Sequence, residues 1–272
     1  YRKEQCMMEE LLDQLLQYLL SEKEEYQGIQ LPDSFDEKFR LYRSLVNVRL
    51  PKPIDPAYLK IQNEFLHEYS LRKGIITLKD MEKLDTHIYL YKGDITRLQV
   101  DAIVNAANAQ MLGCFVPCHG CIDNAIHTFA GIKLREECAN IMRIQGHDEP
   151  CGSAKITKAY QLPSKYILHT VGPIVYGKLT MEHKEQLASC YRSVLQLAYD
   201  RHLRSVAFCC ISTGEFHFPN EEAARIAVAV VKTFLKTHEM EVIFNVFKQE
   251  DETIYHRLLT STKDDEQLDS SS

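Results

Sequence analysis

The sequence has no apolar run that approaches the roughly 20 residues a membrane-spanning helix needs, although the chain is 272 residues long. It also lacks an excess of positive charge, since its formal net charge is −6 and its pI is about 6.0. This charge balance argues against a broad basic face for nucleic acid and leaves room only for a local pocket for a small anion. We therefore expect neither membrane insertion nor nucleic-acid binding.

Two further absences concern processing and redox state. The N-terminus has no basic-then-apolar signal pattern, and because it begins with Tyr1 rather than Met, the sequence leaves a removed targeting segment open. The nine cysteines are not an even set, and five of them fall between Cys114 and Cys151, unlike a secreted disulfide framework. These features favour a protein of the reducing cytoplasm.

Residues 1–80 are predicted to form a helical N-terminal extension. Apolar residues recur at helical spacing over 5–24, which indicates an amphipathic helix. Ser34 and Glu37 form a capping box for a second helix, and Asp55 followed by Pro56 begins a third. Because this region has no convincing strand and no cluster of chemical donors, we expect its helices to serve packing; the alternative is a lid or a platform for a partner.

From about residue 87 the pattern changes to short apolar runs rich in Ile, Val and Tyr, which are typical of strands. The runs are HIYLYKGD, VDAIVNAAN, SAKITKAY, KYILHTVG, RSVAFCCIST and EVIFNVF. Helical patterns cover about 123–143, 182–201, 219–237 and 250–260. The alternation predicts a mixed, mostly parallel sheet with helices on both faces and ligands beyond the carboxyl ends of its strands.

Four metal donors lie within eight positions, namely Cys114, Cys118, His119 and Cys121. Zinc prefers thiolate and imidazole, and a site with three protein donors keeps a fourth position open for water or substrate. His119 and Cys121 are two apart, so in extended backbone they point the same way, while Cys118 points away. We expect one zinc ion per chain on Cys114, His119 and Cys121. Cys118 as fourth ligand would close the site, and the alternative is a set of reduced cysteines without metal.

Polar residues around this loop allow several roles. Asp123 could orient a metal ligand, act as a general base, or cap the helix that follows. Asn105 and Asn108 end the second strand, where one amide is expected to shape the turn and the other to reach a sugar hydroxyl. The spacing does not say which of the two does so.

Two strand ends could hold parts of a nucleotide. Asp94, in GDIT, can accept a proton from an exocyclic amine, although Gly-Asp is also an ordinary turn. In ISTGEFHFPNEEAA, the turn at Gly214 precedes a helix and its N–H groups suit a diphosphate, the alternative being a plain connection. Since the segment matches neither GxGxxG nor GxxxxGK[ST], it supports neither a Rossmann dinucleotide site nor a P-loop.

Taken together and in order, six motifs resemble the macrodomain family of ADP-ribose-binding α/β modules over about 87–260: GDIT, NAAN, DNAIHTFAG, GSAKITKAY, KYILHTVGP and ISTGEFHFP. The chain is most similar to the zinc-dependent branch, protein-ADP-ribose hydrolases that pair a cysteine/histidine loop with a helical extension. It departs from ordinary members where GCFVPCHGC replaces a glycine-rich loop, and at Glu215, where relatives usually carry an aliphatic residue. The resemblance implies a macrodomain-like three-layer fold over 81–262, followed by a tail, 263–272, whose polar composition predicts disorder.

The resemblance also implies roles for individual residues. Asp94 would contact the adenine amine and the Ile95 backbone its ring. Asn108 would reach the distal ribose and, with Asp123 beside the scissile bond, form the catalytic pair. The diphosphate would lie on the turn formed by Thr213, Gly214, Glu215 and Phe216, and Phe216 would also contact the distal ribose. Phe247 would stack on adenine.

These roles predict a zinc-assisted hydrolase that removes mono-ADP-ribose from modified protein side chains, as carboxylate esters. The resemblance implies ADP-ribosylated protein as substrate, with a lipoylated carrier protein and a sirtuin-like ADP-ribosyltransferase as linked partners, and we expect a monomer. Two alternatives stay open: a reader module that binds ADP-ribose around a structural zinc, and a hydrolase of a free derivative such as O-acetyl-ADP-ribose or a cyclic phosphate.

Overall fold

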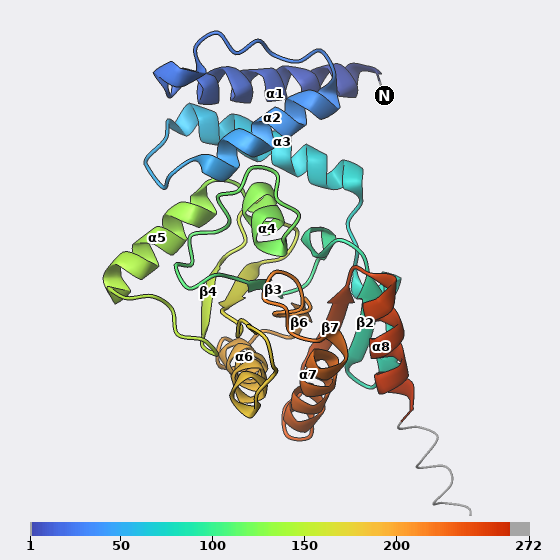
Figure 1. The fold of residues 1–272 in the computed structure, drawn as a ribbon. Helices are drawn as coiled ribbons and strands as arrows, with labels where there is room; N and C mark the ends of the chain where they lie inside the picture. The colour runs from blue at the N-terminus through green and yellow to red at the C-terminus, as the bar shows by residue number, and fades with distance from the viewer. Residues whose placement is uncertain (1, 262–272) are drawn as a thin grey trace, which may run out of the picture.

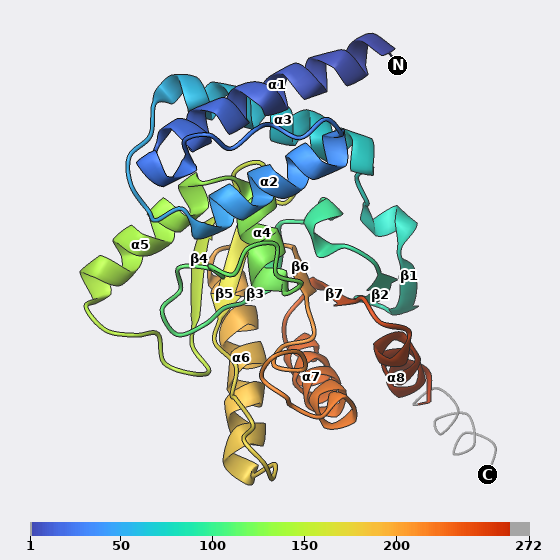
Figure 2. The ribbon, with the colours of Figure 1, turned by 45° about the horizontal axis from the view of Figure 1, so that its top comes forward.

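The structure is a computed structural model that describes residues 2–261. A bundle of three helices is followed by a larger α/β unit, and the bundle lies against one face of that unit (Figures 1 and 2). The predicted disordered tail, 263–272, lies outside the described residues. None of the described helices is both long and apolar enough to span a membrane.

The bundle consists of α1 (Arg2–Ser21), α2 (Phe35–Val48) and α3 (Pro56–Lys73), with a 3₁₀ turn, η1 (Glu24–Tyr26), between the first two. The predicted helix starts are confirmed: the Ser34 side chain accepts from the Glu37 N–H, and that of Asp55 accepts from the Ala57 N–H. Buried apolar side chains of the three helices form a core of their own, including Met8, Leu12, Leu15, Tyr42, Tyr58 and Phe65.

The α/β unit is built on one mixed sheet of seven strands in the order β1-β2-β7-β6-β3-β5-β4. The strands are β1 (Glu82–Asp85), β2 (Ile88–Lys92), β3 (Ala102–Ala106), β4 (Ala154–Lys158), β5 (Tyr166–Thr170), β6 (Ser205–Phe208) and β7 (Glu241–Val246). The five central strands are parallel and the two edge strands, β1 and β4, are antiparallel to their neighbours. The predicted mixed, mostly parallel sheet is confirmed, although β1 was not predicted, because EKLD contains a single apolar residue.

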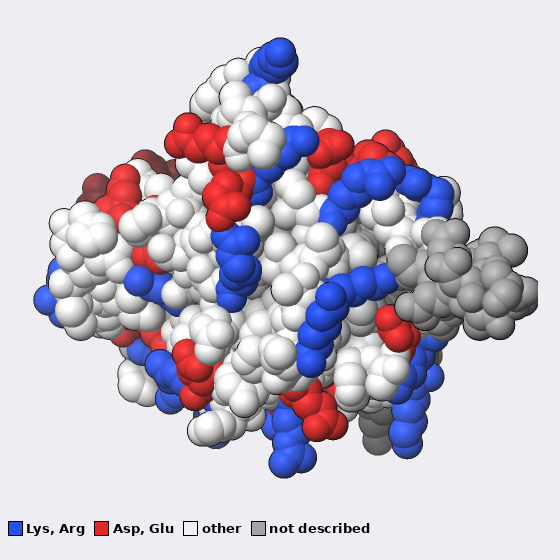
Figure 3. All heavy atoms as spheres, turned by 90° about the horizontal axis from the view of Figure 1, so that it is seen from below, with Lys and Arg blue, Asp and Glu red and all other residues white. Residues whose placement is uncertain are grey.

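Helices cover both faces of the sheet, as predicted. On one face lie α6 (Met181–Asp200), α7 (Asn220–Leu235) and α8 (Gln249–Thr260); on the other lie α4 (Ile122–Ala130) and α5 (Lys133–Gln145), on which the bundle rests (Figure 1). Short 3₁₀ turns, η2 (Leu78–Asp80) and η3 (Ile95–Arg97), flank β1 and β2. Basic and acidic side chains are interspersed on the face seen from below, with no broad basic area there (Figure 3).

The single helix predicted over 123–143 is wrong, because the chain breaks there into α4 and α5. Gly131 stands at the break with φ of +92°, a backbone conformation that side chains rarely adopt. A Cβ at this position would lie 2.6 Å from the Gln62 amide nitrogen of α3. Gln62 also accepts the Ile132 N–H at 3.0 Å, so the break is where the bundle packs onto the α/β unit.

Candidate active site and metal centre

The predicted binding residues follow strands that end at one edge of the sheet. Since β2, β7, β6 and β3 are mutually parallel, their carboxyl ends share that edge. Asp94 follows β2, Asn108 follows β3, the turn 213–216 follows β6, and Phe247 follows β7. Such an edge is where open α/β sheets bind ligands.

The three predicted metal ligands come together on the loop between β3 and α4. One donor atom from each of Cys114, His119 and Cys121 lies within 4.8 Å of the others, and the residues are half-buried. His119 Nδ1 is buried and has no hydrogen-bond partner in the described chain. Two thiols and an imidazole with an unpartnered nitrogen fit zinc, and three ligands leave a coordination position open.

Cys118 points away from this group, as predicted, although its backbone is a turn and not the extended backbone that the spacing argument assumed. Its φ is +53°, and its thiol lies 3.4 Å from the Arg40 carbonyl oxygen and 3.9 Å from the Ser44 hydroxyl, both on α2. Its N–H donates to the Asn47 side chain at 2.9 Å. Cys118 therefore anchors the loop to the bundle, and its thiol does not face the other three donors.

Cys121 also caps the N-terminus of α4. Its sulfur accepts the Asn124 N–H at 3.4 Å, which makes Cys121 the N-cap; the option that Asp123 caps this helix is wrong. Burial raises the pKa of the Cys121 thiol to about 12 and the neighbouring Cys114 adds to the rise, against the lowering effect of the Asn124 N–H. Because thiolates are the binding form, a metal entering here would have to displace protons.

The loop between β3 and α4, residues 107–121, carries the candidate metal donors and is called the metal loop below; it is held by α2. Arg43 donates to the Asn124 side-chain oxygen at 3.0 and 2.8 Å and to the His119 carbonyl at 3.2 Å. Asn47 is 1% exposed; its oxygen accepts from Cys118 and Asn124, and its nitrogen donates to the Thr128 hydroxyl. Of the two options for the N-terminal helices, packing is therefore the one with visible contacts, since these contacts shape the metal loop.

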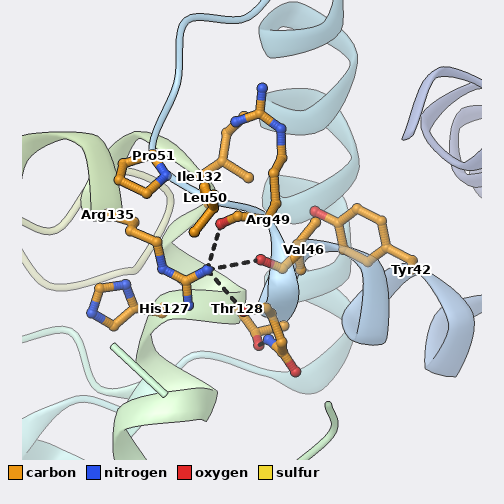
Figure 4. A pocket seen from close by; sticks show the side chains of 11 residues that line it. Tyr42, Val46, Arg49, Leu50, Pro51, His127, Thr128, Ile132 and Arg135 are labelled. Carbon is orange, nitrogen blue, oxygen red and sulfur yellow. Dashed lines mark hydrogen bonds between the residues drawn. The ribbon is translucent and has the colours of Figure 1, made fainter. Parts of the chain in front are cut away.

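Arg135 of α5 connects the helical bundle to the metal loop by hydrogen bonds. Its guanidinium donates to the carbonyl groups of Val46, Asn47 and Arg49 at the end of α2, where helix carbonyls lack partners of their own (Figure 4). It also donates to the Leu112 and Cys114 carbonyls in the loop. A cavity of about 20 Å³ remains beside it, room for about one water and far too small for a nucleotide.

Asp123 is buried behind the loop in a polar network. Asn105 donates to its Oδ1 at 2.8 Å and also lies 3.2 Å from His169 Nδ1, while His169 Nε2 lies 2.9 Å from the Thr157 hydroxyl. Burial raises the pKa of Asp123 to about 6, against the lowering effects of the Asn105 bond and of Arg135. The network assigns Asn105 to holding Asp123.

Asn108 is the more accessible of the two candidate amides. Its nitrogen donates to the Gly113 carbonyl at 3.2 Å and its oxygen accepts the Met111 N–H at 3.2 Å, so the amide also shapes its own turn. Gly113 must be glycine here, because its φ is +83° and a Cβ would lie 2.9 Å from the His127 ring. Asn108 is half-buried, whereas Asn105 is fully buried.

Asp94 caps the η3 turn and is held by two groups. Its Oδ1 accepts from the Thr96 N–H and hydroxyl, and its Oδ2 lies 2.6 Å from Lys73 Nζ at the end of α3. Burial acts to raise the pKa of Asp94, but the bonds from Lys73 and Thr96 outweigh it and leave the pKa below its ordinary value. Ile95 is buried beneath the turn, 4% exposed.

The turn after β6 folds into a compact loop. The Phe218 N–H donates to the Ser212 carbonyl, and the Phe216 carbonyl accepts the Val175 N–H from the loop after β5, both at 2.9 Å. Gly214 and Glu215 are exposed at its tip, while Thr213 and Phe216 are half-buried. The aromatic residue assigned to adenine, Phe247, is 79% exposed.

One contact joins this turn to the metal loop, since Glu215 Oε1 lies 3.7 Å from His119 Nε2. The sequence alone offers no reason for a glutamate at position 215, and this contact shows that it lies beside the candidate metal site. Sequence reasoning missed four residues that hold the site: Arg43, Asn47, Lys73 and Arg135. Their partners lie 21 to 89 positions away along the chain, so no local spacing marks them.

Comparisons with known proteins agree with this fold. The Macro domain family model matches residues 104–227. A protein-ADP-ribose hydrolase of Treponema medium is 50% identical, covering 90% of this chain and 97% of that protein; one of Staphylococcus aureus strain MSSA476 is 45% identical, covering 88% and 93%. The crystal structure of a Trypanosoma brucei macrodomain in complex with ADP-ribose superposes with a TM-score of 0.62 at 34% identity, covering 80% of this chain and 94% of that one.

Proposed function

The chain belongs to the macrodomain family, and from that premise we propose that it is a zinc-assisted hydrolase that releases mono-ADP-ribose from modified proteins. The observation that carries the proposal is the Cys114, His119 and Cys121 group, which lies on the loop directly before Asp123 at the ligand edge of the sheet. The names of the relatives, protein-ADP-ribose hydrolase, support the hydrolase activity.

ADP-ribose would lie along the carboxyl ends of the parallel strands. The ADP-ribose complex of the Trypanosoma brucei macrodomain supports the choice of ligand. Asp94 would accept the adenine amine and the Ile95 N–H would meet the ring, with Phe247 stacked on the base. The exposed tip of the turn 213–216 would receive the diphosphate through its N–H groups. In this order the distal ribose would lie toward Asn108 and the metal loop.

In the hydrolysis, a water molecule adds its hydroxyl and its proton across the bond between ADP-ribose and the side chain. Zinc, when bound, would supply Lewis acidity or lower the pKa of a coordinated water to about 7. The chain's own contribution is orientation: Asn105 fixes the Asp123 carboxyl at 2.8 Å, and the Asn108 amide would face the ribose hydroxyls. Asp123 beside the scissile bond would exchange the proton.

Two features favour a hydrolase over a reader with a structural zinc. A structural site is closed by four protein ligands, but the Cys118 thiol lies against Arg40 and Ser44 of α2. The buried acid Asp123 also follows the ligand loop directly, where a reader needs no acid. We place the enzyme in the cytoplasm as a monomer that acts on carboxylate esters, with a lipoylated carrier protein modified by a sirtuin-like transferase among its substrates.

The test combines zinc content with release of ADP-ribose from an automodified protein carrying carboxylate esters. We expect about one zinc per chain and release of free ADP-ribose that stops on chelation and returns with zinc. Full activity of the metal-free, folded protein would refute the zinc assistance and leave the hydrolase. Binding of ADP-ribose without release would identify a reader, and turnover restricted to O-acetyl-ADP-ribose would identify a hydrolase of free derivatives.

A further inference from the structure

The last residue of the bundle, Lys73, reaches the carboxylate assigned to adenine. Its Nζ lies 2.6 Å from Asp94 Oδ2 and 3.2 Å from the Thr96 hydroxyl. The same ammonium lies 3.9 Å from the centre of the Phe129 ring of α4, a distance at which a ring face attracts a cation. The side chains of Lys73 and Asp94 are only 23% and 33% exposed, so water screens their attraction less than it would at the surface.

The backbone after α3 fixes this arrangement. Gly74 ends the helix with φ of +83°, and its carbonyl accepts Arg97 Nε of η3 at 2.8 Å. Two residues on, Ile76 exchanges backbone hydrogen bonds with the η3 segment, donating to the Arg97 carbonyl at 3.0 Å and accepting the Gln99 N–H at 2.8 Å. These hydrogen bonds hold the end of α3, which carries Lys73, against the turn that carries Asp94.

The acceptor positions of Asp94 show what Lys73 does. A carboxylate offers about four acceptor positions, and Thr96 fills two on Oδ1 while Lys73 fills one on Oδ2. One position on Oδ2 remains for an exocyclic amine. A base that covers Asp94 would expel the remaining water from the carboxylate, which costs much less when a cation already balances the charge. The same cation offsets the repulsion between Asp94 and an anionic diphosphate.

We propose that Lys73 is a positioning residue for adenine recognition, which makes the N-terminal bundle part of the nucleotide site as well as the support of the metal loop. The inference rests on the proposed function, because it takes Asp94 as the acceptor for adenine. It assigns to α3 a role in substrate affinity that is separate from the contacts of α2 with the metal loop. Loss of the ammonium should therefore weaken nucleotide binding while leaving zinc in place.

The experiment measures ADP-ribose affinity by calorimetry and KM and kcat on the automodified substrate, using the full-length, zinc-loaded protein. Lys73→Met, which keeps the length of the side chain and removes its charge, should weaken ADP-ribose binding about tenfold and raise KM alike, with kcat and zinc content unchanged. Lys73→Arg should restore affinity to within about threefold, since a guanidinium can also donate to Oδ2.

Two further variants separate positioning from general loosening of the bundle. Lys38→Met removes an ion pair with Asp13 that is 2.8 Å long and shielded within the same bundle, and it should leave affinity unchanged. In an Asp94→Ala background, Lys73→Met should weaken binding less than about twofold, because Lys73 acts through Asp94.

Each result decides one assignment. Equal losses from Lys73→Met with and without Asp94, or an equal loss in Lys38→Met, would overturn the positioning role, as would a loss confined to kcat. If the wild type binds and releases ADP-ribose and Asp94→Ala weakens the binding, the proposed function and the adenine assignment stand whatever Lys73 does. If the wild type does not bind ADP-ribose, the proposed function falls and the role of Lys73 falls with it.

Discussion

Glu215 Oε1 lies 3.7 Å from His119 Nε2, so the turn after β6 lies beside a proposed ligand on the metal loop. His119 Nδ1 is the nitrogen that is buried without a partner in the described chain. If the buried nitrogen binds the metal, Nε2 carries the proton and its N–H faces the Glu215 carboxylate, which at 3.7 Å lies beyond hydrogen-bond distance but attracts it electrostatically. The carboxylate therefore lies between the turn assigned to the diphosphate and the candidate metal site.

Glu215→Gln should weaken zinc binding only modestly, by about threefold, because it removes a charge that attracts the imidazole N–H from an exposed, solvent-screened position. Competition with a chromophoric chelator measures this affinity without reference to activity. Glu222→Gln is the matched control, since it removes the same charge from the first turn of α7, where Glu222 pairs with Lys184 at 2.9 Å. Equal zinc affinity in the two variants would contradict the role of Glu215.

Cys121→Ala should lose zinc and hydrolase activity while the α/β unit stays folded. The reason is that two remaining donors hold zinc poorly, whereas the core of the sheet is formed by apolar side chains outside the loop. Cys118→Ala should keep its zinc, because that thiol faces α2. Metal analysis and circular dichroism of both variants check the prediction; global unfolding of Cys121→Ala would show that the metal is structural.

Much of this architecture could be predicted from local patterns. Ser34 and Asp55 cap helices as their neighbours indicate, and the alternation of apolar runs gives the sheet and its covering helices. The donor spacing correctly separates Cys118 from the other three donors, although the extended backbone it assumes is absent: Cys118 lies in a turn with φ of +53°. These features depend on residues that are only a few positions apart, so a local pattern in the sequence is enough to predict them.

The rest depends on contacts between distant segments. The break at Gly131 is set by Gln62 of α3, which no helical periodicity over 123–143 reveals. Arg135 has the appearance of an ordinary helix residue in the sequence, yet it binds the end of α2, 86 to 89 positions earlier. A packing role for the N-terminal helices could therefore be predicted, but not which side chains support the site.

Asn47→Ala tests the support that α2 gives to the metal loop. The substitution removes hydrogen bonds to Cys118, Asn124 and Thr128 in a nearly inaccessible place and leaves their donors and acceptors unpaired, which costs about 1 to 3 kcal/mol of unfolding free energy. Zinc affinity should fall as well, because the loop loses its fixed shape. Asn63→Ala, at an exposed position of α3, is the control; unchanged zinc affinity in Asn47→Ala would show that the loop needs no such anchor.

The stability of the protein should depend on pH through His169. Its side chain is fully buried, and burial lowers its pKa from 6.5 to about 3. Above pH 6.5 both the folded and the unfolded chain hold it neutral, so its contribution to stability is complete. As the pH falls from 6.5 toward about 3, only the unfolded chain takes up the proton, and stability is lost progressively.

Between pH 7 and pH 5 this loss amounts to roughly 2 kcal/mol for His169 alone, and burial of His127, whose pKa also lies well below its ordinary value, adds to it. Asp123 opposes the loss, because its pKa is raised to about 6 and the folded chain takes up that proton over the same range, so the comparison of variants isolates His169. Urea unfolding with a chelator present, so that zinc does not contribute its own pH dependence, gives the free energies. His169→Gln should be less stable at pH 7 yet show a clearly smaller drop toward pH 5. His67→Gln, at an exposed position of α3, should keep the wild-type drop. An identical pH dependence in wild type and His169→Gln would mean that His169 does not stay neutral in the folded protein. Its hydrogen bonds with Asn105 and Thr157 would then have to be made by the protonated ring.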